Sequence, residues 1–121
     1  MISIQIETIP HRDQRYDTCG DWWMSPAARW HVRVSRMDNW KFEMLVAVHE
    51  LVEMTLCYVA DVPQGVIDEF DINYNGNEIE PGDDPGAPYH KQHCIATGIE
   101  RVLAACMGVK WAEYERAINS L

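Results

Sequence analysis

The sequence lacks several features that would assign a chain directly to a functional class. Among 121 residues only 10 are Lys or Arg, against 19 Asp or Glu, and the formal net charge is −9. A phosphate backbone repels such a chain, which disfavours broad nucleic-acid binding. No apolar run reaches the roughly eighteen residues that a membrane span needs. There is also no internal repeat and no low-complexity tract. We therefore expect neither a membrane segment nor a nucleic-acid partner.

The cysteines also lack the spacing of a known framework. They form no C-x-x-C pair and no zinc-ribbon pattern, and three of them lie in apolar helical contexts where free Cys behaves as a small hydrophobe. The first residues do not read as a signal peptide. We expect a reduced, cytoplasmic protein. The four cysteines are Cys19, Cys57, Cys94 and Cys106.

The composition is that of one ordinary folded domain over residues 1–121. Hydrophobic residues make up 47% and charged residues 24% of the chain, and five Trp with five Tyr argue against disorder. Strict alternation predicts strands over residues 2–9 and 30–35, antiparallel to each other. Between them, residues 11–28 are expected to form a long ordered loop whose tryptophans, Trp22 and Trp23, pack against the body.

The rest of the chain is predicted to be helical. A first helix should run from an N-cap at Asp38 to about Val59, and a shorter one from residue 63 or 64 to about 74. Residues 75–88 are rich in Gly, Pro and Asp and cannot be regular. Further helices are expected over 89–107, stopped by Gly108, and over 111–119. The predicted fold is α+β: a small N-terminal antiparallel hairpin or sheet (1–36) packed on three to four helices (38–121).

The first helix carries the most informative residues. From Met44 to Ala60 it is apolar nearly throughout, yet it contains His49, Glu50 and Glu53. Burying unpaired carboxylates is costly, so these groups need compensation, and a metal ion would pair with both charges and use the imidazole. On a helix His49 and Glu53 stand one turn apart on one face. This is the arrangement of a His-Glu-x-x-His zinc helix with Glu in place of the second His.

The second part of the expected site comes from the helix over 89–107. His93, Thr97 and Glu100 recur on one face at helical spacing. We expect His49, Glu53 and His93 to be metal ligands, the pattern of a catalytic zinc with one open position. Glu100 is a further ligand or the carboxylate that orients a ligand histidine. Glu50, adjacent but not a ligand, is the expected general base.

Two other interpretations of these residues remain open. The pairs Glu50 with Glu53 and Asp68 with Asp71 have the spacing of an all-carboxylate Mg²⁺ or Mn²⁺ site. In the other interpretation, the ionisable residues of the first helix form a buried polar network in a non-enzymatic interaction protein. In addition, residues 80–88 are either a rigid loop beside the site or a plain surface connection.

Several short segments together resemble a family of small phage and prophage proteins of unknown function. The resemblance covers most of the chain and implies a location in the cytoplasm of the host cell, but it implies no activity. The chain also resembles zincin metalloproteases, only over His49-Glu50. The segments that carry the phage resemblance are Ile9-Pro10-His11, Gln14-Arg15-Tyr16, Gly20-Asp21-Trp22, residues 49–53, Phe70-Asp71, residues 80–85 and Ala87-Pro88-Tyr89.

From the sequence we therefore expect a zincin-like protein that binds a divalent metal, Zn²⁺ before Mg²⁺ or Mn²⁺. It would be a metal-dependent hydrolase of phage origin, acting on a substrate or protein partner that the sequence does not identify. The alternative is a non-enzymatic phage interaction protein.

Overall fold

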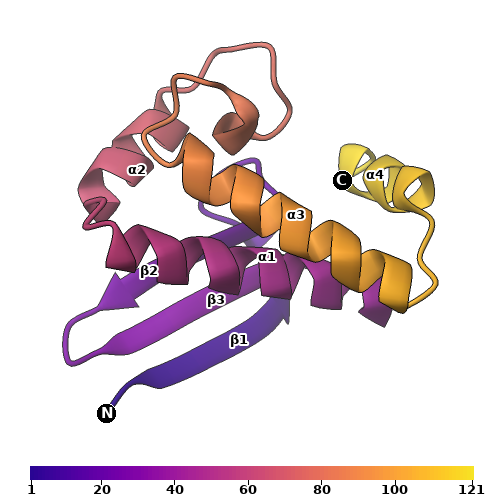
Figure 1. Ribbon diagram of the computed structural model, residues 1–121, viewed down its shortest axis with the longest axis horizontal. Helices are drawn as coiled ribbons and strands as arrows, with labels where there is room; N and C mark the ends of the chain where they lie inside the picture. Colours follow the sequence, from indigo (N-terminus) through magenta and orange to yellow (C-terminus); the bar gives the residue numbers. More distant parts are fainter.

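A computed structural model describes residues 1–121 and confirms the α+β fold, with a small N-terminal sheet and four α-helices (Figure 1). No helix combines the length and the apolar character needed to cross a bilayer. The elements are β1 (Ser3–Ile9), β2 (Gly20–Ser25), β3 (Arg29–Ser35), α1 (Trp40–Val59), α2 (Gln64–Ile72), α3 (His90–Cys106) and α4 (Trp111–Asn119), with short 3₁₀ turns at His11–Asp13 and Pro81–Asp83.

The sheet differs from the expected one in two ways. Its strand order is β1-β3-β2, and β1 runs parallel to β3, so the predicted antiparallel pairing of these two strands is wrong. Residues 11–28 are not only a loop, because they contain β2, which pairs antiparallel with β3. Only three residues separate Ser25 from its partner Arg29, and two of them, Ala27 and Ala28, have the positive φ that such tight turns often need. This hairpin reverses the chain, so that β3 lies beside β1 in the same direction.

Helix α1 is the central element of the molecule. It contacts β2 and β3 on one side and α3 on the other, so it lies between the sheet and α3 (Figure 1). Contact on two sides explains why residues 44–60 are apolar around most of the helix. The core between α1 and the sheet is formed mainly by Trp30, Val32 and Val34 of β3 with Leu45, Val46, Met54 and Cys57 of α1.

The ends of α1 and α3 follow ordinary capping rules, with one correction. The N-cap of α1 is Asn39, whose side chain accepts the backbone N–H groups of Lys41 and Phe42, and not Asp38. Asp38 lies in the left-handed region at φ 54°, outside the helix. Gly108 follows the end of α3 with φ 69°, as expected for a helix stop.

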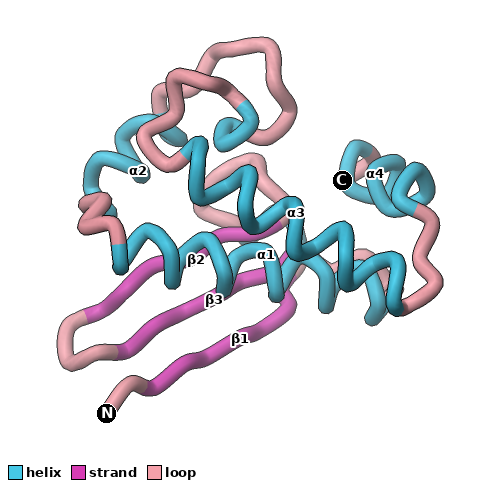
Figure 2. Tube along the Cα trace, in the orientation of Figure 1, coloured by secondary structure: helices cyan, strands magenta, loops and turns pink.

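The segment between α2 and α3 positions part of the site. Helix α2 ends at Ile72, two residues before the predicted end, and Ile67 is its one fully buried residue. The following loop returns over the first turn of α3, where the turn Pro81–Asp83 contacts that helix (Figure 2). Pro81 and Gly82 are buried there.

Candidate metal centre

Three side chains from α1 and α3 converge where the two helices pack together. The distances are 3.2 Å from His49 Nε2 to Glu53 Oε2, 2.8 Å from Glu53 Oε2 to His93 Nδ1, and 3.1 Å from His93 Nδ1 to His49 Nε2. All three residues are buried, with 5–7% of their surface exposed. They are the one set of three such residues whose potential ligand atoms lie close enough together to hold a metal ion. The structure thus brings together the three ligands expected from the sequence.

The triangle formed by His49 Nε2, Glu53 Oε2 and His93 Nδ1 has a size that suits a small metal ion. With bonds of 2.0–2.1 Å, a tetrahedral zinc ion holds its ligand atoms about 3.3 Å apart. The observed separations of 2.8 to 3.2 Å are slightly shorter. Small outward rotations of the three side chains would therefore be enough to accommodate the ion.

Each histidine makes a hydrogen bond on the side away from the triangle, and this bond leaves the nitrogen that faces the triangle without a hydrogen. His49 Nδ1 lies 2.8 Å from Glu100 Oε1, and His93 Nε2 lies 2.9 Å from Asp83 Oδ1. A carboxylate accepts, so each of these nitrogens carries its hydrogen and donates it. In the neutral imidazoles the lone pairs of His49 Nε2 and His93 Nδ1 then face Glu53 Oε2. Three lone pairs about 3 Å apart repel one another unless a proton or a metal cation lies between them.

The pKa values show the same need for positive charge. Burial lowers the pKa of both histidines, but hydrogen bonds to carboxylates outweigh it: the pKa of His49 is raised, mainly by Glu100 and Glu53. That of His93 rises to about 10 because of Asp83 and Glu53. Burial raises the pKa of Glu53, but its hydrogen bonds with the two imidazoles dominate and lower it to about 2. A divalent ion would supply the charge that protons supply in its absence.

Each of the three candidate ligands is held by a second partner. The Trp22 indole Nε1–H donates to Glu53 Oε1 at 2.9 Å, leaving Oε2 for the triangle. Glu100, which orients His49, is itself buried and accepts the Tyr114 hydroxyl through its other oxygen. Hydrogen-bonded outer partners of this kind accompany metal ligands in proteins.

The position of Glu100 decides between its two expected roles. It contacts His49 Nδ1, the nitrogen that points away from the triangle. The structure therefore favours an orienting carboxylate over a fourth ligand.

Sequence reasoning missed three of these partners. Asp83 lies in the irregular segment between α2 and α3, and Tyr114 on α4. Trp22 was expected only to pack against the body, although its N–H was a signal, since a buried indole N–H needs an acceptor.

Glu50 lies beside the triangle without a hydrogen-bond partner. Only 8% of its surface is exposed, yet no group of the protein donates to its carboxylate. Gly20 makes room for it, because a Cβ at Gly20 would lie 2.5 Å from Glu50 Oε1. Burial, followed by the charge of Glu53, raises the pKa of Glu50. A carboxylate that is buried, unpaired and adjacent to possible metal ligands is suited to accept a proton from water.

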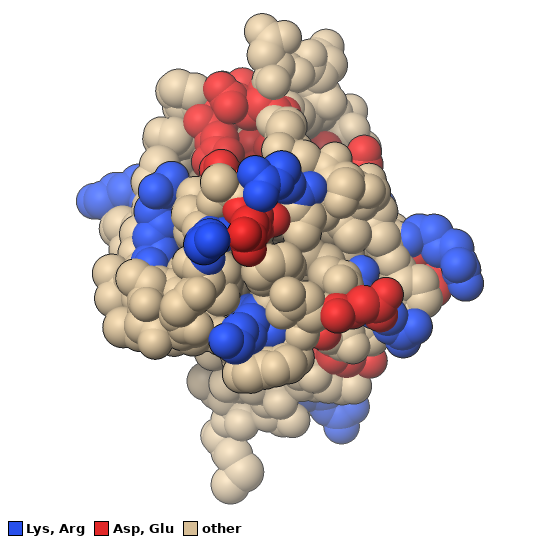
Figure 3. All heavy atoms as spheres, turned by 90° about the vertical axis from the view of Figure 1, so that its right-hand side faces the viewer, with Lys and Arg blue, Asp and Glu red and all other residues tan.

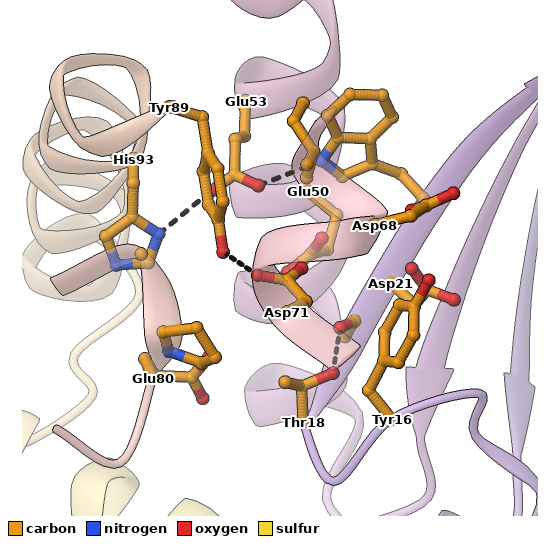
Figure 4. A pocket seen from close by; sticks show the side chains of 15 residues that line it. Tyr16, Thr18, Asp21, Glu50, Glu53, Asp68, Asp71, Glu80, Tyr89 and His93 are labelled. Atoms are coloured by element: carbon orange, nitrogen blue, oxygen red, sulfur yellow. Dashed lines mark hydrogen bonds and ion pairs between the residues drawn. The ribbon is translucent and has the colours of Figure 1, made fainter. Parts of the chain in front are cut away.

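Two hollows meet at Glu50. The smaller is a cavity of about 30 Å³, room for one or two waters, that Glu50, Glu53 and His93 line together (Figure 4). The larger is a groove of about 450 Å³ between α1, α3, α4 and residues 77–83, with His49, Glu50 and His93 in its lining. Its volume lies in the range of small-molecule sites.

The groove is acidic. Glu78, Glu80, Asp83 and Glu115 line it, and Arg101 is its one Lys or Arg. Seen from the α4 side, acidic side chains gather near the top of the molecule (Figure 3). Such a lining repels phosphate-rich ligands.

The all-carboxylate arrangement receives less support. Asp68 lies 3.5 Å from the Arg15 guanidinium, and Asp71 accepts the Tyr89 hydroxyl at 2.6 Å. Both line the small cavity, but their oxygens do not form a close set with those of Glu50 and Glu53. The two histidines are thus better placed to hold an ion than the second acidic pair.

Comparisons of this chain with models of protein families, with curated proteins and with solved structures find no match.

Proposed function

We propose that this protein is a divalent-metal-dependent hydrolase whose ion is bound by His49, Glu53 and His93. The observation that carries this proposal is the convergence of three lone-pair atoms within 2.8–3.2 Å of one another. Without an ion, protons on the inner nitrogens of the two histidines would have to supply the positive charge that the three atoms need, as the raised pKa values of both imidazoles indicate. Three protein ligands also leave one position open, as in catalytic zinc sites.

Zinc is the ion that this donor set favours. Imidazole nitrogens suit Zn²⁺, whereas Mg²⁺ and Mn²⁺ prefer oxygen ligands. Two of the three converging atoms are imidazole nitrogens, and only Glu53 contributes an oxygen. The likeness to zincins is confined to His49, Glu50 and the one-turn spacing, since Glu53 stands where a zincin helix has its second histidine.

The chemistry divides between the ion and Glu50. When bound, zinc polarises a carbonyl group and lowers the pKa of water. Glu50 takes a proton from the attacking water and later gives it to the leaving group. It can do both because no protein group occupies its carboxylate and because it borders both the small cavity and the groove. Ionised Glu50 is the active form of this base, and a nearby cation stabilises that form.

The groove narrows the class of substrate. It is large enough for a segment of peptide or another ester- or amide-bearing molecule. Because its acidic residues outnumber its one Arg, we expect neutral or cationic substrates and no nucleic acid.

The proposed setting is the cytoplasm of a host cell, with a phage as the source of the chain. The phage origin rests on the resemblance of its short segments alone. All four cysteines are free, and Cys94 and Cys106 are exposed, which agrees with a reducing environment.

The variant Glu50→Gln tests the assignment of roles. It should bind zinc as the wild type does and lose at least 100-fold of any turnover on a panel of peptide, amide and ester substrates. His93→Ala should lose both zinc and turnover. If Glu50→Gln loses its zinc, Glu50 is a ligand and the carboxylate site is revived. If zinc-loaded wild type hydrolyses nothing in the panel while Glu50→Gln binds zinc equally well, a structural metal site in an interaction protein explains the protein better.

A further inference from the structure

The outward face of α3 is apolar over three turns. Apart from Arg101, every exposed residue of this helix between positions 94 and 106 is uncharged. Ile95 and Ile99 are 43% and 44% exposed, and Val102 is 66% exposed. A helix at the surface of a monomer normally presents polar residues to water, whereas α3 is apolar here as well as toward the core. The residues of this face are Cys94, Ile95, Gly98, Ile99, Val102, Ala105 and Cys106.

This face continues onto α1. Val48 of α1 and Leu103 of α3 line a shallow groove together with the outward residues of α3, and no charged side chain lines it. Met44, one turn before Val48, is 48% exposed. Together these residues expose on the order of 450 Å² of apolar surface, about the size of the largest apolar patch on a soluble protein, and such a patch is often functional.

We propose that a second copy of this chain covers this face, so that the protein is a symmetric dimer with its two α3 helices crossing near Gly98. A two-fold interface must fit itself, and this face contains both the projecting and the recessed parts that such a fit needs. Ile95, Ile99 and Val102 project. Beside them, an added Cβ at Gly98 would meet nothing within 4 Å, which leaves space for a side chain of the second copy.

The area of this face agrees with a second copy as the occupant. The net charge of −9 opposes self-association in general, but no charged side chain lines this groove, so none faces another across the contact. A standard interface buries about 800 Å² per partner, of which about 57% is non-polar, or roughly 450 Å². The apolar surface of this face is about that large. The opposite side of α3 carries His93 and Glu100 of the candidate metal centre, but the proposed dimer does not depend on a bound metal.

Two matched variants test the dimer. Val102 and Ile72 are both 66% exposed, but Ile72 ends α2 and lies outside this face. Light scattering during size-exclusion chromatography should give the wild type twice the chain mass of 14.0 kDa. Val102→Glu should raise the dimer dissociation constant at least tenfold and give a monomer on dilution, while Ile72→Glu should remain dimeric.

A second α3 variant and a folding control keep the test decisive. Ile95→Glu should also give a monomer, and circular dichroism should show wild-type helix content in all three variants. A monomeric wild type at every concentration would overturn the proposal. So would a polydisperse wild type, or a dimer that Val102→Glu and Ile95→Glu leave intact.

Discussion

Glu100 and Asp83 should both strengthen zinc binding, and to different extents. Each carboxylate accepts a hydrogen bond from the outer nitrogen of one ligand histidine, Glu100 from His49 and Asp83 from His93. Glu100→Gln and Asp83→Asn keep the shape of the side chain but remove its negative charge. The outer N–H is then held less firmly, and the inner nitrogen becomes a poorer ligand.

The burial of the two carboxylates sets the expected magnitudes. Replacing such outer partners costs about 10- to 100-fold in metal affinity, or roughly 1.4–2.7 kcal/mol. Glu100 is only 5% exposed and is also held by Tyr114, so Glu100→Gln should lie near 100-fold. The side chain of Asp83 is 49% exposed, and water screens its charge, so Asp83→Asn should lie near tenfold.

The assay is competition between the protein and a chromophoric chelator for Zn²⁺ at neutral pH. Glu113→Gln serves as the control, because Glu113 lies exposed on α4 and pairs only with Lys110, at 3.9 Å. Wild-type affinity in Glu100→Gln would refute the orienting role. A loss as large as that of His49→Ala would show instead that Glu100 is itself a ligand.

Two further predictions concern stability. Burial raises the pKa of Asp71 to about 7 although the Tyr89 hydroxyl donates to it, so the folded state loses stability as pH rises from about 4 to about 7. At about pH 8, Asp71→Asn should therefore need more urea to unfold than the wild type, because its free energy of unfolding is larger by roughly 1–2 kcal/mol. At about pH 4 the two proteins should unfold at the same urea concentration. An equal gain at both pH values would contradict this cause. A Cβ on buried Gly82 would lie 2.5 Å from the His93 ring, so Gly82→Ala should cost about 1–3 kcal/mol and weaken zinc binding. Gly65→Ala in α2 is the matched control, because a Cβ there would have no atom within 4 Å, and it should leave stability unchanged or raise it. Equal melting temperatures of the two variants would exclude the close contact between Gly82 and His93.

The helices could be predicted because their signals are local. α4 runs from Trp111 to Asn119 as expected, and Gly108 marks the end of α3. The strand β2 could not be predicted, because the turn before β3 uses Ala27 and Ala28 at positive φ. Alanine rarely adopts that conformation, so no turn signal such as Asn-Gly separated the two strands.

The convergence of the three candidate ligands could also be predicted, and so could Glu100 as an orienting carboxylate, whereas the other partners could not. His49 and Glu53 share a face of one helix, and helical spacing alone set His93 on the matching face of another. Asp83 reaches His93 only because the loop after α2 folds back over α3. The unexpected pairing of Glu100 with Tyr114 likewise depends on where α4 packs.

The zinc content of protein purified without added metal tests the central claim most directly. Elemental analysis should find about one zinc ion per chain in the wild type and almost none in His93→Ala. His31 is half-buried, stacked on Trp23 at the sheet and distant in sequence from the three candidate ligands. It provides the control His31→Ala, which should keep its zinc. A wild type that contains no metal, and whose melting temperature neither added Zn²⁺ nor EDTA changes, would contradict the account.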